Sequence, residues 1–255
     1  MTYNFHTHTS RCGHAYGTVR DYVEEAMEAG ITEMGFSDHA PMPAMPETSW
    51  RVSLDEAADY VKEIKALREK YKDKITLHIG FEMEYYPKHF EEMLTFARSV
   101  GAEYLILGQH FTFNEDEGSV HSYQGSADEC QLVSYADALT AGMRSGVFTY
   151  VAHPDVFHFR GDETIYEREM TKVCAASLET GIPLEINFLG IRDKRHYPSE
   201  KFWRIAGRVG CPVCFGFDAH DPRAAADLAS LSAAEELVKR YALRYAPPVI
   251  RSIKD

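Results

Sequence analysis

The chain has 255 residues, 45% hydrophobic and 26% charged, as in an ordinary soluble globular protein. Asp and Glu outnumber Lys and Arg by 39 to 27, and a formal charge of −12 argues against a broad nucleic-acid or anionic-membrane surface. No apolar run is long enough to span a membrane, no targeting segment is recognisable, and the 5 scattered cysteines suit reduced thiols. We therefore expect a cytoplasmic protein without nucleic-acid or membrane partners, whose oligomeric state stays open.

Strands and helices are predicted to alternate from the N-terminus onward. Residues 2–8 alternate in polarity as a strand does, which places His6 and His8 side by side on the polar face. A helix follows, because Thr18 and Asp21 have the spacing of a capping box and Gly30 is a suitable stop. Two imidazoles two residues apart on a strand can hold one cation together.

The same rhythm continues to the end of the chain. Further strands are expected at 33–37, 75–82, 104–109, 148–152, 183–188 and 213–220. Further helices are expected to open at 53, 87, 128, 199 and 222, with one more that stops at Gly181. Seven strand–helix units imply a parallel sheet, and the length suits a barrel. No linker divides the sequence, so we predict an α/β fold with a TIM-like (β/α)7 barrel over a single domain, residues 1–255.

Metal-capable side chains recur near the carboxyl ends of the predicted strands, where such barrels carry their active sites. They are His6, His8, His14, His39, Glu82, His110, His153, Asp218 and His220. Imidazole and carboxylate ligands suit zinc, manganese or iron better than calcium or magnesium. The set exceeds the needs of one ion, and a shared glutamate can bridge two. Two or three divalent ions held close together are suited to the hydrolysis of phosphate esters.

The motifs that carry these residues resemble the polymerase and histidinol phosphatase (PHP) family, in that family's order. They are His6-Thr7-His8, Ser37-Asp38-His39, Gly80-Phe81-Glu82, Gly108-Gln109-His110, Ala152-His153-Pro154 and Phe217-Asp218-Ala219-His220. The resemblance implies a distorted (β/α)7 barrel with a trinuclear metal centre. It implies three ligand sets: His6, His8, Glu82 and Asp218 for the first ion; Glu82, His110 and His153 for the second; His14, His39 and His220 for the third.

Within the family, the chain is similar to the histidinol-phosphatase branch, which removes phosphate from L-histidinol phosphate in histidine biosynthesis. The resemblance implies attack on phosphorus by a metal-bridging hydroxide, with Glu82, Asp218, His220 and Arg160 as catalytic residues. Loop arginines would hold the phosphate: Arg160, with Arg192 or Arg195. Glu115, Glu117 or Glu185 would receive the cationic part of the substrate.

Two other functions are compatible with the same motifs. A related PHP hydrolase would act on nucleotides, nucleic-acid ends or phosphotyrosine, and only its loops would differ; a nuclease should show a basic, aromatic-lined groove, which the net charge of −12 disfavours. The second of these alternatives is a non-catalytic barrel whose metals are structural. The complete set of ligand positions argues against it.

Overall fold

The computed structural model of the chain describes residues 1–115 and 118–254 and contains one parallel sheet. Its strands pair in chain order from β1 to β8. They are β1 (Tyr3–Asn4), β2 (Glu33–Phe36), β3 (Thr76–Met83), β4 (Tyr104–Leu107), β5 (Phe148–Val151), β6 (Leu184–Asn187), β7 (Pro212–Gly216) and β8 (Arg244–Tyr245). The seven predicted strands are therefore confirmed, and β8 is an addition.

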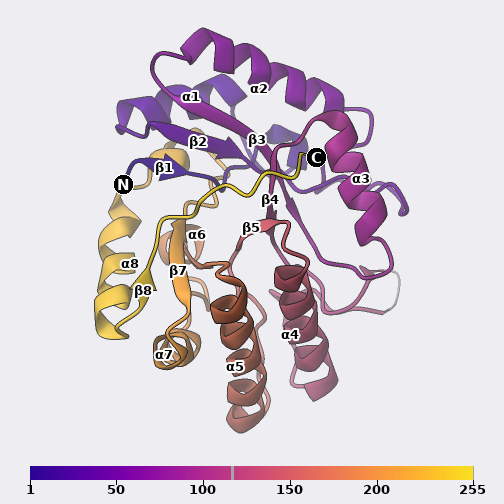
Figure 1. Cartoon of the computed structure of the whole chain (residues 1–255), viewed down its shortest axis with the longest axis vertical. Helices are drawn as coiled ribbons and strands as arrows, with labels where there is room; N and C mark the ends of the chain where they lie inside the picture. The colour runs from indigo at the N-terminus through magenta and orange to yellow at the C-terminus, as the bar shows by residue number, and fades with distance from the viewer. Residues whose placement is uncertain (116–117, 255) are drawn as a thin grey trace.

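Helices connect the strands and cover the outside of the sheet, which curls around the centre of the molecule (Figure 1). They are α1 (Val19–Glu28), α2 (Ala57–Tyr71), α3 (Phe90–Val100), α4 (Glu129–Arg144), α5 (Glu163–Thr180), α6 (Phe188–Arg192), α7 (Glu200–Val209) and α8 (Ala229–Arg240). The capping box predicted at Thr18 and Asp21 is present at the start of α1. Among the helices of the described residues, none is long and apolar enough to cross a membrane.

The sheet closes at the carboxyl ends of its first and seventh strands. Thr7 forms a parallel bridge with Ala219: the amide of His8 donates to the Ala219 carbonyl at 2.9 Å, and the amide of Ala219 donates to the His6 carbonyl at 3.1 Å. This closure confirms the TIM-like (β/α)7 barrel. It also brings the first histidines of the chain beside Asp218, more than 200 residues later.

The interior of the barrel is packed near the amino ends of the strands. Tyr104 and Tyr150 lie there fully buried, and the Tyr104 hydroxyl donates to the Phe5 carbonyl at 2.9 Å. The C-terminal segment crosses this end of the barrel after β8, as the yellow trace in Figure 1 shows. The amide of Ile253 at its far end donates to the Glu103 carbonyl at 3.0 Å. The packed end leaves only the opposite, carboxyl end open for chemistry.

Three of the differences between predicted and observed element boundaries bear on the site. The first strand is only two residues long, because its regular pairing with β2 ends at Asn4; farther along, Thr7 accepts from the Ser37 amide and forms a bridge with Ala219 after β7. The predicted loop after β6 begins with α6, whose first turn is capped by the Asn187 side chain, which accepts from the Gly190 amide at 2.9 Å. The predicted last helix is divided into a 3-10 turn at Pro222–Ala226 and α8.

Glu103 ties three parts of the fold together, and its replacement by Gln is expected to destabilise the protein by about 1–2 kcal/mol at pH 7. Its carboxylate accepts from Arg68 of α2 at 3.0 and 2.5 Å, from Lys254 at 2.8 Å and from the amide of Ile79 at 3.2 Å. Burial alone would raise the pKa of Glu103, but these donors lower it to about 2. Urea unfolding of wild type and variant measures the difference in free energy.

The pH dependence of that difference checks its cause. Because the pKa of Glu103 is lower in the folded state, its stabilisation is full above about pH 4.5 and is lost as the pH falls toward 2. The gap between wild type and Glu103→Gln should therefore narrow below pH 4.5. Glu179→Gln is the matched control, since it breaks an exposed arginine pair and should leave stability unchanged. A gap that stays constant with pH would rule out this ionic explanation.

Candidate metal centre and active site

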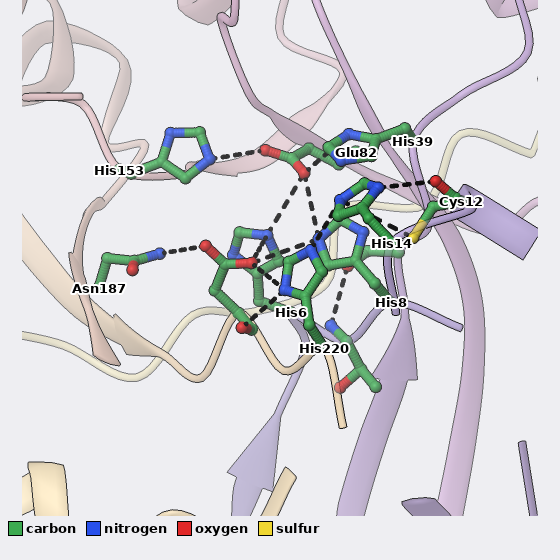
Figure 2. A network of polar contacts seen from close by, with 12 residues as sticks. His6, His8, Cys12, His14, His39, Glu82, His153, Asn187 and His220 are labelled. Carbon is green, nitrogen blue, oxygen red and sulfur yellow. Dashed lines mark hydrogen bonds and ion pairs between the residues drawn. The ribbon is translucent and has the colours of Figure 1, made fainter. Parts of the chain in front are cut away.

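Glu82 lies at the centre of a cluster of imidazoles at the carboxyl end of the barrel (Figure 2). It belongs to β3, and its side chain is 1% exposed. Its Oε2 atom is 3.4 Å from His6 Nε2, 3.3 Å from His8 Nε2 and 3.3 Å from His39 Nδ1. One carboxylate oxygen thus faces three ring nitrogens that come from two different strand ends.

The other oxygen of Glu82 faces a second pair of rings. Its Oε1 atom is 3.4 Å from His110 Nε2 and 2.9 Å from His153 Nε2. Asp218, after β7, completes the first group, because its Oδ1 is 3.5 Å from His6 Nε2. Glu82 therefore stands between two sets of potential ligands, as a bridging carboxylate would.

A third group is formed by His14 and His220, whose Nε2 atoms approach to 3.0 Å. The Nδ1 atom of His14 lies 2.7 Å from the Cys12 carbonyl, and that of His220 lies 3.2 Å from the Asp218 carbonyl. A ring nitrogen next to a carbonyl must donate its proton, so in the neutral rings both Nε2 atoms carry lone pairs. Two lone pairs that point at each other indicate a shared cation.

The residues present fit divalent cations. Ring nitrogens of His6, His8 and His39 and both oxygens of Glu82 are buried and have no hydrogen-bond partner among the described residues. Leaving such atoms unpaired is costly. Two ligands about 2.1 Å from one tetrahedral ion lie about 3.4 Å apart, which is longer than a hydrogen bond. Most separations in the cluster have this longer value.

The charge balance of the cluster favours bound cations as well. Burial alone would raise the pKa values of Glu82 and Asp218, but the surrounding imidazoles hold both well below the usual range. Burial lowers the pKa of His220 to about 3 and that of His39 well below its ordinary value. Both carboxylates are thus ionised, and both of these rings are neutral, which is the form that binds a metal.

Glu185, predicted to contact the substrate, has a different position. It is fully buried below the cluster: its Oε1 lies 2.7 Å from His6 Nδ1, and its Oε2 accepts from the amide of His153 at 2.8 Å. It does not line the cavity above the cluster, and its contact with the substrate stays a prediction. Its contact fixes the ring of His6 with Nε2 toward Glu82, as outer carboxylates do for metal-binding histidines. Asn187 accompanies it, donating to Glu185 at 2.8 Å and to Asp218 at 3.0 Å.

The backbone is unusual at two of the predicted ligands. His153 has a φ of 29° and Asp218 a φ of 47°, a region that side-chain-bearing residues rarely adopt. Such conformations cost free energy and gather at functional sites. Gly108, before His110, packs so close to Glu82 that a Cβ atom there would overlap the carboxylate. These backbone conformations reduce local stability, and they bring the candidate ligands together.

A cavity of about 420 Å³ opens above the cluster. Seven of the nine predicted ligands line it, and His6 and His8 are buried. The other lining residues are Tyr16, Trp50, His121, Tyr123, Val156, Leu189, Arg192, Asp193, Arg195, Tyr197 and Asp221. Its size suits a small molecule that rests on the ligand cluster.

Two of the three predicted phosphate-binding arginines line this cavity, and the third does not. Arg192 lies on its wall and pairs with Asp227 at 2.9 Å. Arg195 also lines it, and donates to the Tyr197 hydroxyl at 3.1 Å. Arg160 is exposed, donates to the Gln124 carbonyl at 3.1 Å and is not among the lining residues. Its role in catalysis and phosphate binding stays a prediction.

The acidic loop predicted to receive the substrate's cation is engaged elsewhere. Glu115 accepts from Arg51 at 2.6 Å and does not line the cavity, and its contact with the substrate stays a prediction. Glu117 lies outside the described residues. The carboxylates that do line the cavity, apart from the cluster itself, are Asp193 and Asp221. Asp193 follows α6, which the sequence pattern did not reveal, and Asp221 precedes the 3-10 turn at Pro222–Ala226.

Aromatic residues of the cavity wall were also missed by the sequence analysis. Trp50 lines the cavity with its ring centroid 5.2 Å from that of His39, and Tyr123 and Tyr197 line it from the loops after β4 and α6. They come from segments without regular periodicity, so no pattern pointed to them. An available signal was their place in loops that follow the carboxyl ends of strands.

The comparisons with known proteins agree with this geometry. The sequence model of the family described as "PHP domain" matches residues 4–188, which is more than half of the chain. The chain belongs to the PHP domain family. A relative from Deinococcus radiodurans, described as "probable histidinol-phosphatase", is 29% identical, and the match covers 85% of each chain. The histidinol-phosphatase of Bacillus subtilis is 26% identical over 84% of this chain and 92% of its own.

Solved structures share the fold of this PHP domain. The histidinol phosphate phosphatase of Lactococcus lactis, solved with zinc, L-histidinol and phosphate, superposes with a TM-score of 0.74 at 21% identity. The match covers 99% of this chain and 98% of that one. The putative histidinol phosphatase of Listeria monocytogenes has the same TM-score at 18% identity, over 90% of this chain and 99% of its own. At these identities the likeness establishes the fold.

Proposed function

We propose that this PHP domain is a metal-dependent phosphomonoesterase that hydrolyses L-histidinol phosphate to L-histidinol and phosphate. The observation that carries the proposal is the cavity whose floor is the imidazole–carboxylate cluster and whose wall includes Arg192 and Arg195. Cations below and guanidinium groups beside the same space suit a phosphate group. The relatives from Deinococcus radiodurans and Bacillus subtilis support the choice of the ester.

The cluster would hold two or three divalent ions, of zinc, manganese or iron. Glu82 would join the set of His6, His8 and Asp218 to the set of His110 and His153, and the rings of His14, His39 and His220 would hold a third ion. When bound, such ions activate water and withdraw charge from the phosphate oxygens. Zinc in the Lactococcus lactis structure supports this assignment.

The remaining roles belong to the cavity wall. Arg192 and Arg195 would orient the phosphate oxygens. As water adds to phosphorus, the P–O bond to histidinol would break, and the histidinol oxygen would take up the equivalent of the proton that the water loses. Asp193 and Asp221 line the cavity, unlike Glu115 and Glu185, and would attract the cationic leaving group. Trp50 and Tyr123 offer flat apolar surfaces to an imidazole ring. Glu82, Asp218 and His220 line the floor of the cavity, where they would hold the metal ions next to the phosphate.

The location is also part of the proposal. All five cysteines are free in the described structure, and four of them, Cys12, Cys174, Cys211 and Cys214, are buried. Free thiols are usual in a reducing compartment. We therefore propose that the enzyme works in the cytoplasm.

Phosphate release from a panel of esters tests this function. L-histidinol phosphate, p-nitrophenyl phosphate, a dinucleotide and a phosphotyrosyl peptide are each offered to enzyme loaded with zinc, manganese or iron. We expect histidinol phosphate to have the highest kcat/KM, and Asp218→Asn to lose that activity by more than about 100-fold, because the variant lacks a charged metal ligand.

Other results distinguish the alternatives. If another ester turns over and histidinol phosphate does not, the protein is a different PHP phosphatase, as for the relatives from Shewanella described only as "probable phosphatase". If metals bind and no ester in the panel is hydrolysed, the metal-binding barrel without catalysis becomes the better account.

A further inference from the structure

A buried cation lies next to the cluster and has no role in the function proposed above. Arg51, in the loop between β2 and α2, is 5% exposed. A guanidinium group in such a place requires compensating partners. Its Nη2 is 3.0 Å from Glu84 Oε1, and its Nη1 is 2.6 Å from Glu115 Oε2. Arg51 thus joins two carboxylates from two different segments, one after β3 and one after β4.

Glu84 carries this contact into the cluster. Its side chain is 1% exposed, and the Oε1 atom that faces Arg51 is also 3.0 Å from His110 Nδ1. The opposite nitrogen, His110 Nε2, is the one that faces Glu82, at 3.4 Å. A carboxylate on Nδ1 selects the tautomer whose Nε2 lone pair is free, and holds the ring in that orientation.

The flat face of the same guanidinium group supports the cavity wall. Its central carbon is 3.7 Å from the ring centroid of Trp50, which is a stacking distance. The Trp50 ring centroid lies 6.0 Å from that of His110. Through one rigid planar group, Arg51 therefore contacts both Glu84, the partner of the candidate ligand His110, and Trp50 in the cavity wall. Lysine, a single point charge without a planar face, cannot make these contacts together.

We propose that Arg51 is a positioning residue of the metal centre, which orients His110 through Glu84 and fixes the Trp50 wall by stacking. The proposal rests on the proposed function in one respect: that the cluster holds metal ions. It does not depend on which ester is hydrolysed. Glu115 is the second carboxylate partner of Arg51 and keeps its guanidinium group in place.

Metal retention tests the proposal without any substrate. Holoenzyme is exposed to a chelator, and the metal content is followed over time by mass spectrometry for Arg51→Gln, Arg51→Lys and Glu84→Gln. Arg68→Gln is the matched control, since it removes an arginine–glutamate pair away from the cluster. We expect one equivalent of metal to be lost about 10- to 100-fold faster from Arg51→Gln and Glu84→Gln, and at the wild-type rate from the control.

Two further measurements separate positioning from general stability. The double variant Arg51→Gln/Glu84→Gln should release metal no faster than the worse single variant, because Arg51 and Glu84 both act through His110. Arg51→Lys should keep the fold but not restore metal retention. With p-nitrophenyl phosphate, Arg51→Gln should lower kcat more than it raises KM. If Arg51→Gln does not fold, Glu84→Gln gives the same readout by itself.

The results that overturn the proposal are distinct from those that overturn the function. Wild-type metal retention in folded Arg51→Gln and Glu84→Gln would show that these residues serve the fold alone. Rescue by Arg51→Lys would show that charge is enough and the planar contacts are not needed. A protein that retains metals as expected but ignores histidinol phosphate refutes the proposed function and leaves Arg51 as assigned; a wild-type protein that binds no metal refutes both.

Discussion

Glu82→Gln is expected to reduce phosphatase activity by about 1,000-fold or more and to release most of the bound metal. The carboxylate faces five imidazoles, three with one oxygen and two with the other. An amide of the same shape has no negative charge and offers only one good acceptor atom. Losing the stabilisation of several kcal/mol that metal ions give to the transition state corresponds to such a factor.

The measurement combines kcat/KM with metal content by mass spectrometry, on protein whose circular dichroism matches wild type. Glu33→Gln is the control, because it breaks another histidine–glutamate contact, with His78 at 2.9 Å, at the opposite end of the same strands. It should retain full activity and metal. A Glu82→Gln enzyme that keeps its metals and turns over within tenfold of wild type would remove Glu82 from the centre of the site.

Metal affinity should rise steeply with pH between about 6.5 and 10. Burial alone would lower the pKa of His6, but Glu185, Asp218 and Glu82 together raise it to about 10. The metal-free protein therefore keeps a proton on this ring at neutral pH, and an incoming ion must displace it. Each displaced proton makes the apparent affinity about tenfold stronger per pH unit.

The raised pKa of His6 also determines how the stability of the metal-free protein depends on pH. Because the pKa of His6 is raised in the folded state, its stabilising pairing is complete below its unfolded value of about 6.5 and is lost as the pH rises through about 10. The metal-free protein should thus lose stability toward alkaline pH, where the metal-loaded protein does not.

Calorimetric titration with zinc in two buffers of different ionisation enthalpy counts the released protons. At pH 7.5 we expect at least one proton per protein, and fewer for Glu185→Gln, because Glu185 is the strongest of the charges that raise the pKa of His6. Zinc binding with no proton release and an affinity independent of pH would contradict this account of the cluster.

Much of the fold could be predicted because its signals are local. The alternation along β3 and the capping box of α1 each lie within a few residues, and both are present in the structure. The short α6 could not be predicted, since its sequence appears as a basic loop and depends on the Asn187 cap. β8 pairs over two residues, and no periodicity can indicate so short a strand.

The candidate ligands were predictable for a similar reason, whereas their supporting residues were not. In a parallel barrel, strand ends meet at one edge, so metal-capable residues at those ends converge whatever the loops do. Whether a carboxylate faces the cavity or a neighbouring ring depends on closure between distant segments. Glu185 meets His6 from 179 residues away, and Glu115 meets Arg51 from 64 residues away. Residue type alone therefore could not predict either contact.

Anomalous diffraction from crystals of the zinc-loaded protein, recorded on both sides of the zinc absorption edge, would locate the metal ions themselves. We expect strong peaks on both sides of the Glu82 carboxylate, one beside His6, His8 and Asp218 and another beside His110 and His153, with a further peak between His14 and His220. Peaks confined to other parts of the molecule, or a cluster without any peak at full zinc loading, would contradict the assignment of this site as a metal centre.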